Sequence, residues 1–362
     1  MRETIHFLSK ISGITRDEIA AISDDIGYDD IYRLDVNYIK SFAPKAKITA
    51  DSLEKLFKRY EKIIELHESN DISYITFADE KFPDSLRDIS SAPKVLYYKG
   101  DVSLLKYHSN IGVVGTRKPS SYGKWAASSL VKDLVQNGFC IVSGFAGGID
   151  SISHKAAIDN SGRTICVFGT PITKIYPAKN KKLYDNVLFC GGLIISEHDA
   201  TELTQPAFFA ARNRIISGLS SGLLIVEAGV KSGTLITARY ALDQGKHIFA
   251  VPGNINSVNS YGTNTLIKDG ACMVTSVMDI LFEYGYRQSN ACKKSENHDN
   301  LSDLSAYEQK IYDLVRTYGQ CTSEKIAMSS DIKIQDILAI LNILDIKGYI
   351  LYDGFMATYL TR

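Results

Sequence analysis

The sequence predicts an α/β fold built on a mostly parallel sheet, with a small helical domain before it and a second small domain after it. Three observations support this prediction: short apolar runs alternate with helical segments from residue 111 onward, residues 1–66 show helical apolar spacing, and the pattern changes again after residue 304. The chain has 362 residues, 45% of them apolar, which is enough for more than one domain and a large core.

The N-terminal part is predicted to be helical. Its apolar and charged positions alternate at helical spacing, most clearly in LEKLFKRYEKIIEL at 53–66. We therefore expect a small helical domain over residues 1–68. The following stretch, Tyr74 to Gly100, contains FPDSLRDISSAPKVLYYKG, which predicts an irregular lead-in that ends in a short strand.

Seven short apolar runs predict the strands of the sheet. They are IGVVG (111–115), FCIVSG (139–144), TICVFG (164–169), LIISE (193–197), LLIVEA (223–228), HIFAVPG (247–253) and ACMVTS (271–276). Continuous apolar strands that alternate with helices are typical of a parallel sheet covered on both faces. Together with the lead-in, they predict one large domain over residues 69–286.

The C-terminal part has a different pattern. RQSNACKKSENHDNLSD at 287–303 is polar and aperiodic, which predicts a linker. LSAYEQKIYDLVRTYG, TSEKIAMSS and IQDILAILNILDIKG then predict three helices, and YILYDGFMATYL predicts a hairpin that turns at Asp353-Gly354. Three helices followed by a hairpin indicate a winged-helix-like domain over residues 304–362.

Composition excludes several classes of protein. The six cysteines are scattered with no CxxC, and no histidine pair has ligand spacing, so we expect reduced core cysteines and no metal site. No apolar stretch approaches the roughly 18 residues of a membrane span. The N-terminal MRETIHFLSK lacks the apolar core of a secretory signal, so we expect a cytoplasmic protein. Residues 111–284 hold 16 Lys and Arg against 12 Asp and Glu, which places any polyanion site there.

The loops after the strands are the candidates for a binding site, because ligands of open α/β sheets bind beyond the carboxyl ends of the strands. The first loop has Thr116-Arg117-Lys118 where dinucleotide enzymes have a smooth glycine turn. SGFAGGID (143–150) and GVKSGT (229–234) each open a helix with glycines, which suits an anion. FFAARNRIISGLSS (208–221) adds a run of two arginines and an asparagine.

Each of these features also has a plain structural explanation. A glycine-rich turn often only packs a helix against a sheet, and Phe208 and Phe209 are more often core residues than stacking platforms. One arginine of an Arg-Asn-Arg run on a helix often pairs with an internal carboxylate such as Glu197 or Glu227. The convergence of three anion-friendly loops and two cationic clusters on one sheet edge favours a phosphate-binding site.

Six segments occur in an order that carries a specific resemblance. They are VVGTRKPSSYG, IVSGFAGGIDSISH, TICVFGTPITKIYPAKN, RNRIISGLSSGLLIVEA, KSGTLITARYALDQGKHIFAVPG and GTNTLIKDGA. Together they closely resemble the DNA-processing protein A family (DprA, also called Smf), from about Tyr74 to Tyr284. The resemblance implies an extended Rossmann-like domain, preceded by a SAM-like helical domain. It also implies a homodimer that binds single-stranded DNA without sequence preference, protects it during natural transformation and loads the RecA recombinase onto it, without metal or nucleotide cofactors.

The resemblance further implies which residues contact the DNA. The expected single-stranded DNA site consists of Thr116, Arg117, Lys118, Ser143, Gly144, Lys179, Phe209, Arg212, Asn213, Lys231, Ser232 and Gly233. Arg117 matches the family's main phosphate-contacting arginine, and Phe209 matches the phenylalanine of its F-P-x-R-N run. Here the proline of that run is Ala210, and the preceding ATELTQPAF has no Lys or Arg. Binding is therefore expected either to be weaker or to depend more on Arg117, Lys118, Lys179, Lys181 and Lys182.

The alternative is a nucleotide phosphoribohydrolase-like enzyme on a related sheet. GVKSGTLIT at 229–237 resembles the P-G-G-x-G-T-x-x-E run of those enzymes, but Thr237 stands where the catalytic glutamate would be, and Lys231-Ser232 replace the Gly-Gly pair. Such an enzyme needs that carboxylate to stabilise an oxocarbenium-like transition state. No G-x-G-x-x-G follows a strand and no P-loop is present. The sequence therefore favours a DNA-binding protein that is not an enzyme.

Overall fold

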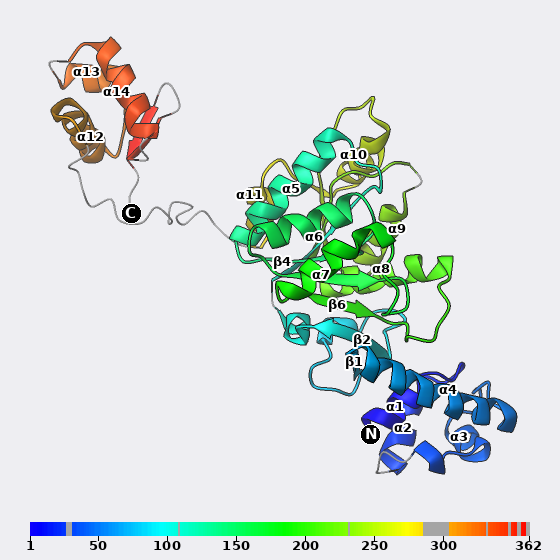
Figure 1. Ribbon diagram of the computed structural model, residues 1–362. Coiled ribbons are helices and arrows are strands. Elements are labelled where there is room, and N and C mark those ends of the chain that lie inside the picture. The colour runs from blue at the N-terminus through cyan, green and yellow to red at the C-terminus, as the bar shows by residue number, and fades with distance from the viewer. Residues whose placement is uncertain are drawn as a thin grey trace. The chain divides into compact units, whose positions relative to one another are not determined.

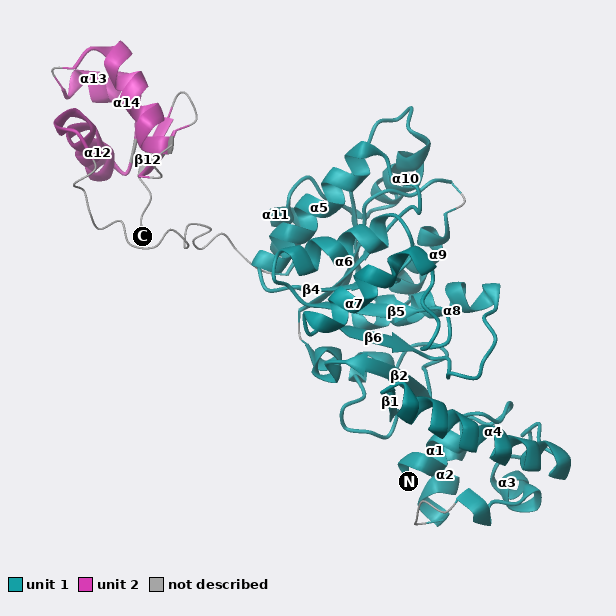
Figure 2. Ribbon diagram, in the orientation of Figure 1, with its two compact units in different colours: residues 1–284 teal, residues 285–362 magenta. Residues whose placement is uncertain are grey.

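The structure of the protein is a computed structural model that describes residues 1–26, 31–107, 109–230, 232–284, 304–330, 332–346, 349–352 and 356–359. The chain divides into two compact units, Met1–Tyr284 and Gly285–Arg362 (Figure 2). None of the helices in the described ranges is both long and apolar enough to span a membrane.

The first unit begins with the helices α1 (Arg2–Leu8), α2 (Arg16–Ile26), α3 (Val36–Phe42) and α4 (Ala50–Ser69), which confirms the helical N-terminus (Figure 1). Helix α4 starts at a capping box, in which Thr49 and Ser52 each satisfy a backbone N–H of the other. Leu53, Tyr60 and Ile63 lie on its buried face. The apolar spacing seen in the sequence is therefore the spacing of the core side of α4.

The main sheet confirms the predicted α/β fold. Its strands are β1 (Ser73–Thr76), β2 (Val95–Gly100), β3 (Asn110–Val114), β4 (Cys140–Ser143), β5 (Thr164–Phe168), β6 (Leu193–Ser196), β7 (Gly222–Ile225), β8 (His247–Ala250) and β9 (Cys272–Met273). Across the described residues these strands form one sheet in the order β1-β2-β6-β5-β4-β3-β7-β8-β9. Strands β3 to β9 are parallel, whereas β2 runs antiparallel to both β1 and β6. Strand β1 is an addition to the predicted set.

Helices cover both faces of the sheet, as the continuously apolar strands predict. They are α5 (Ser121–Gln136), α6 (Ile149–Asp159), α7 (Lys181–Phe189), α8 (Pro206–Leu219), α9 (Gly233–Asp243), α10 (Tyr261–Lys268) and α11 (Val277–Glu283). Ala127 of α5 and Ile149 of α6 pack with Val113 on one face. Ile216 of α8 and Ala238 of α9 belong to the core on the other face. Buried side chains on both sides stabilise the parallel sheet.

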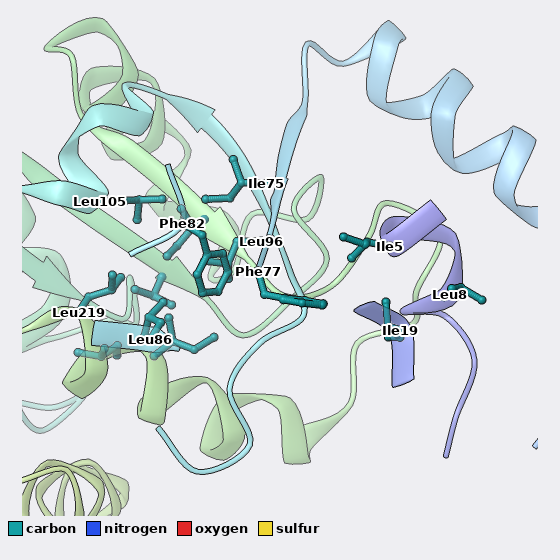
Figure 3. Close-up of a cluster of buried hydrophobic side chains, with 14 of the residues drawn as sticks. Ile5, Leu8, Ile19, Ile75, Phe77, Phe82, Leu86, Leu96, Leu105 and Leu219 are labelled. Atoms are coloured by element: carbon teal, nitrogen blue, oxygen red, sulfur yellow. The ribbon is translucent and has the colours of Figure 1, made fainter. Parts of the chain in front are cut away.

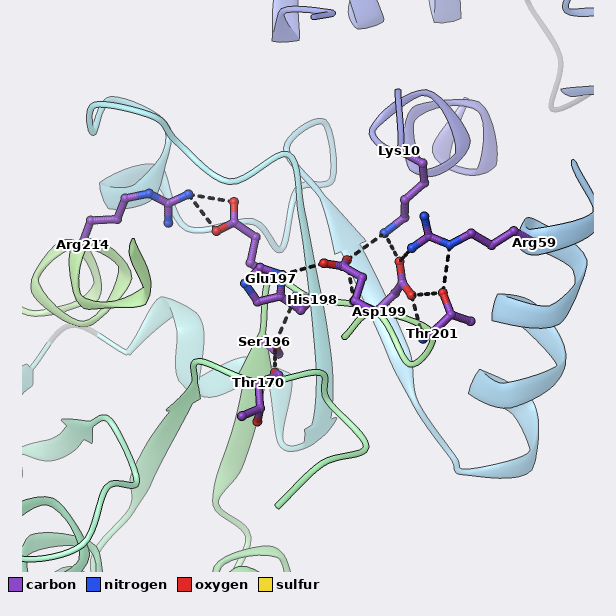
Figure 4. A network of polar contacts seen from close by, with 10 residues as sticks. Lys10, Arg59, Thr170, Ser196, Glu197, His198, Asp199, Thr201 and Arg214 are labelled. Carbon is purple, nitrogen blue, oxygen red and sulfur yellow. Dashed lines mark hydrogen bonds and ion pairs between the residues drawn. The ribbon is translucent and has the colours of Figure 1, made fainter. Parts of the chain in front are cut away.

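The N-terminal helices join the sheet through a shared core. Figure 3 shows Ile5 and Leu8 of the helices in the same buried cluster as Ile75 and Leu96 of β1 and β2. The contact also includes a charged group, Asp199, whose carboxylate is fully buried (Figure 4). This carboxylate lies 2.6 Å from Lys10 Nζ and 3.2 Å from Arg59 Nη2. The helices and the sheet are therefore held together by both apolar packing and buried ion pairs.

The second unit contains the helices α12 (Ala306–Tyr318), α13 (Ser323–Met328) and α14 (Ile334–Ile346) and the strands β10 (Gln320–Thr322), β11 (Ile350–Tyr352) and β12 (Met356–Tyr359). The strands form an antiparallel sheet in the order β10-β12-β11. Buried Ile311, Ile326 and Leu341 join the three helices in one core. The linker at 287–303 and the turn at Asp353-Gly354 lie outside the described residues, and the winged-helix assignment stays a prediction.

Candidate functional site

The order of the strands locates a candidate site. Strands β4, β5 and β6 lie on one side of β3, and β7, β8 and β9 lie on the other, so the winding reverses between β3 and β7. Ligands of open α/β sheets bind at the carboxyl ends of the strands at such a reversal. A cavity of about 440 Å³ opens there, lined by residues that follow β3 and β4, by α8 and by the start of α9. A smaller hollow adjoins it and shares Arg117, Phe209 and Arg212 with it.

The cavity brings together seven of the twelve residues that the resemblance implies. These are Thr116, Arg117, Phe209, Arg212, Asn213, Ser232 and Gly233. Gly144 lines the adjoining hollow. Residues up to 117 positions apart in the sequence thus meet at one sheet edge, because the parallel strands all end there.

The loop after β3 is fastened at both ends. The Thr116 N–H donates to the carbonyl of Glu227 (2.8 Å), and the Ile149 N–H donates to the carbonyl of Thr116 (3.2 Å). The buried Glu227 carboxylate accepts hydrogen bonds from the backbone N–H (2.9 Å) and the hydroxyl (2.5 Å) of Ser120, which caps α5. Gly148 has a φ of +88°, and a Cβ there would lie 2.4 Å from the carbonyl oxygen of Thr116, so only glycine fits. The loop therefore presents Arg117, whose side chain is exposed, from a rigid base.

Arg212 differs from Arg117 because it is buried. It is 6% exposed, and its Nη1 donates to the carbonyls of Gly144 and Val167. A Cβ at position 144 would lie 2.6 Å from the guanidinium, so glycine is needed for this approach. Nη2 donates no hydrogen bond to any described residue. Arg212 thus ties α8 to the ends of β4 and β5 and also lines the cavity.

The cavity contains one carboxylate among the described residues, that of Asp150. Burial raises the pKa of Asp150, and the nearby Arg212 and Arg117 guanidiniums partly offset that rise. Burial likewise lowers the pKa of Arg212 to about 10, with Asp150 acting in the opposite direction. The two arginines outnumber the single carboxylate, so the cavity favours an anion.

Four predicted residues lie around the cavity or outside the described part. Lys118 is exposed beside Arg117 but does not line the cavity. Lys179 is exposed, and its Nζ would lie 3.6 Å from a Cβ built on Gly147, so it faces the glycine-rich loop after β4. Ser143 is fully buried and its hydroxyl donates to the carbonyl of Val113 (2.6 Å), so its side chain supports the sheet instead of lining the cavity. Lys231 lies outside the described residues.

The neighbouring phenylalanines of α8 have different environments. Phe209 lines both hollows, and its ring centroid lies 5.3 Å from that of the exposed Tyr176. Phe208 instead stacks on His198 with ring centroids 3.6 Å apart. Of the pair, Phe209 is therefore the ring placed where a base could stack.

The start of α9 forms the far wall of the cavity. The Ser232 hydroxyl accepts a hydrogen bond from the Thr234 N–H and so caps the helix. The Asn213 side chain reaches from α8 to the carbonyl of Gly233 at 3.5 Å. Ser232 and Gly233 thus bring a helix N-terminus, which carries a partial positive charge, to the cavity.

Sequence reasoning did not identify Asp150 and Tyr176 as site residues. Asp150 ends the glycine-rich segment SGFAGGID, so its position in the first turn of α6 was readable, but its burial beside two arginines was not. The suggested pairing of one arginine with an internal carboxylate is confirmed, because Arg214 Nη2 lies 2.7 Å from Glu197 Oε1 (Figure 4). No group of three or more potential metal ligands occurs in the described ranges.

Comparison with known proteins identifies the family. Residues 73–285 match the model of the family described as DNA recombination-mediator protein A. The chain is 39% identical over 239 residues to DNA processing protein DprA of Bacillus subtilis, covering 66% of this chain and 80% of the relative. It is also similar to the X-ray structure of DNA processing protein A from Streptococcus pneumoniae (TM-score 0.64, 34% identity, 78% of this chain and 98% of that chain). A structure that addresses the single-stranded DNA binding mode of the Helicobacter pylori protein matches with a TM-score of 0.53 and 32% identity, over 59% of this chain and 95% of that one. The chain belongs to the DNA recombination-mediator protein A family, the DprA/Smf proteins.

Proposed function

We propose that this chain binds single-stranded DNA without sequence preference in the cavity at the strand reversal. The observation that carries the proposal is the meeting of exposed Arg117 and buried Arg212 in one open cavity, beside the N-terminus of α9. Cations and backbone N–H groups in such a groove contact phosphates, which are the same for every sequence, and Phe209 offers a ring on which any base can stack. The single-stranded DNA binding mode described for the Helicobacter pylori relative supports the same ligand.

We further propose a role in natural transformation. In this role the protein, working as a cytoplasmic homodimer, protects incoming single strands and loads the RecA recombinase onto them. Membership of the DprA/Smf family supports this proposal, since its members are described as DNA processing proteins. DNA processing is the broader activity within which these steps fall.

We assign the parts of the chain separate duties within this proposal. Residues 69–286 carry the DNA site, residues 1–68 form a helical domain that supports it, and 287–303 link it to the winged-helix-like domain at 304–362. The third helix of that domain, α14, has Asp336 in its first turn and no basic residue in its last turn. A helix of this charge suits contact with protein better than contact with phosphates.

We propose that the protein acts as a binder and not as a nucleotide phosphoribohydrolase. Thr237 lines the cavity at the position where those enzymes carry their catalytic glutamate. The carboxylate of Asp150 is buried and accepts a hydrogen bond from the Ala146 N–H at 3.3 Å, so it serves the local fold. Incubation of the protein with nucleoside monophosphates should release no free base. The enzyme would be favoured if free base is released, if Thr237→Val leaves this release unchanged and if Asp150→Asn abolishes it.

The test of DNA binding compares Arg117→Ala with Arg163→Ala. Arg163 is an exposed arginine that precedes β5, so it lies at the opposite edge of the sheet from the cavity and serves as the matched control. Affinity for a labelled oligo-dT is measured by fluorescence anisotropy at several salt concentrations, without metal or nucleotide. Loss of one phosphate contact should lower the slope of log K against log salt by about 0.7.

The expected result is a weaker affinity and a flatter salt dependence for Arg117→Ala, with Arg163→Ala unchanged. Oligonucleotides of different sequence should lose affinity equally, because phosphate contacts carry no sequence information. Equal effects of the two variants, or no effect of either, would place the DNA site elsewhere.

A further inference from the structure

Helix α5, which follows the Arg117 loop directly, exposes two aromatic rings. Tyr122 is 44% exposed and Trp125 is 66% exposed, and their ring centroids lie 6.1 Å apart. The Tyr122 hydroxyl donates to the carbonyl of Pro252 at 2.9 Å, which fixes this ring beside the loop after β8. Two large rings that lie next to each other and stay this exposed form an apolar surface, and such surfaces often bind a partner.

The rings belong to a stripe along the outer side of α5. Tyr122, Trp125, Ser129 and Lys132, which we call the α5 stripe, follow one another at the helical spacing of three and four residues. The opposite side of α5 buries Ala126, Ala127, Leu130, Val131 and Leu134 in the core. The helix is therefore anchored by its inner side, and the stripe leads away from the cavity loop along a rigid element.

Several lysines around the stripe lack a counter-ion in the described part of the chain. Lys118, Lys124 and Lys132 form no ion pair with any carboxylate among the described residues, and Asp133 is the one acidic residue of α5. Four exposed lysines on other helices of the same unit are instead paired with a carboxylate four residues away. These pairs are Lys55–Asp51 and Lys58–Glu54 on α4, Lys155–Asp159 on α6 and Lys181–Asp185 on α7. The outer side of α5 therefore keeps uncompensated positive charge next to its two rings.

The combination of exposed aromatic rings and unpaired lysines on α5 suits binding of nucleic acid better than binding of protein. Lysine is depleted at the centres of protein–protein interfaces, whereas basic residues that alternate with exposed aromatic rings are the usual surface of single-strand binders. We infer that single-stranded DNA leaving the cavity continues along the α5 stripe, with bases stacked on Tyr122 and Trp125 and phosphates beside Lys124 and Lys132. The inference rests on the proposed DNA binding, since the cavity holds the strand that the stripe extends.

The chain offers a direct probe of this path, because Trp125 is its single tryptophan. Tryptophan fluorescence of the full-length protein is followed during titration with oligo-dT of about 5 and about 20 nucleotides, the first near the lower end and the second beyond the upper end of the usual site of one single-strand-binding module. The long oligonucleotide should quench Trp125 by stacking, and the short one should bind with little quenching because the cavity alone accommodates it.

Variants separate the path from the cavity. Trp125→Ala should weaken binding of the long oligonucleotide about tenfold or more, the loss expected for one stacked base, and leave the short one within about twofold. Trp125→Phe should recover most of the lost affinity, because any ring can stack. Phe189→Ala is the matched control, since Phe189 is 91% exposed at the end of α7 that leads into β6, at the opposite edge of the sheet.

Failure of this inference can be told apart from failure of the proposed function. If the wild-type protein binds neither oligonucleotide, DNA binding itself is wrong. In a second case, the wild-type protein binds both oligonucleotides and Arg117→Ala weakens the binding of both. If DNA of either length then leaves the Trp125 fluorescence unchanged and Trp125→Ala does not change the affinity, the path over α5 is wrong and the cavity site stands. A Trp125→Ala variant that loses self-association by light scattering, with unchanged DNA affinity, would also overturn the inference in favour of a protein contact.

Discussion

Replacing Arg212 by methionine tests whether this arginine supports the fold, the DNA site or both. Methionine keeps a similar length but removes the donors that reach the carbonyls of Gly144 and Val167. Each hydrogen bond from a charged donor contributes about 1.5–3 kcal/mol, so two contribute roughly 3–6 kcal/mol. Part of this is offset because burying the guanidinium is itself unfavourable, as its pKa of about 10 indicates.

The net loss for Arg212→Met should therefore be on the order of 2–4 kcal/mol of unfolding free energy. For a unit of this size, each kcal/mol corresponds to about 2–4 °C in Tm, which predicts a drop of roughly 4–16 °C. The DNA affinity should fall as well, because Nη2 faces no protein acceptor in the described structure and is available to a phosphate.

Arg117→Met is the matched comparison, since Arg117 lines the same cavity with an exposed side chain. It should weaken DNA binding and shift the Tm by no more than about 1–2 °C, as is usual for surface substitutions. Calorimetry and anisotropy on both variants give the comparison. An unchanged Tm for Arg212→Met together with lost DNA binding would refute the structural role argued here.

Three further predictions concern other parts of the first unit. Phe209→Ala should weaken single-strand binding by about 1–3 kcal/mol with little change in Tm, whereas Phe208→Ala should lower the Tm and spare binding; the reverse pattern would exchange their roles. Asp199→Asn should lower the urea unfolding free energy by up to about 3–5 kcal/mol, because the buried Lys10 ammonium, 2.6 Å from Asp199, then keeps only the Glu202 carboxylate at 3.9 Å; a loss below about 1 kcal/mol, the value of an exposed pair, would contradict it. Burial lowers the pKa of His67 to about 4, below the 6.5 or so of an unfolded chain, so the unfolded state takes up the proton first. The His67 contribution to stability should be complete above about pH 6.5 and fall by on the order of 2 kcal/mol toward pH 4. Burial also lowers the pKa of His6 and His154, so His67→Phe should lose only the share of His67 in urea titrations at several pH values.

The sequence by itself was sufficient for the class of the fold and for the sheet edge at which the candidate site lies. Seven apolar runs matched β3 to β9, because strands covered by helices on both faces are largely apolar, although Met273 of the edge strand β9 is exposed. The same reasoning placed the loops after β3, β4 and β7 at one edge, since parallel strands end on the same side. The apolar runs did not predict strand β1 (Ser73–Thr76), because this antiparallel edge strand of four residues has no continuous apolar run and gains its register only by pairing with β2.

The tertiary structure alone decided what each polar side chain of the site does. Arg117 and Arg212 are the same residue type, yet one is exposed and the other binds two carbonyls at the ends of β4 and β5. Glu227 is a carboxylate at a strand end, yet it binds Ser120 and so fixes the loop that presents Arg117. Local periodicity shows which side of an element is buried, but a polar group finds its partner among residues that are distant in sequence. The free energy of burying such a group depends on whether that partner is there, and this is settled only when the strands and helices pack.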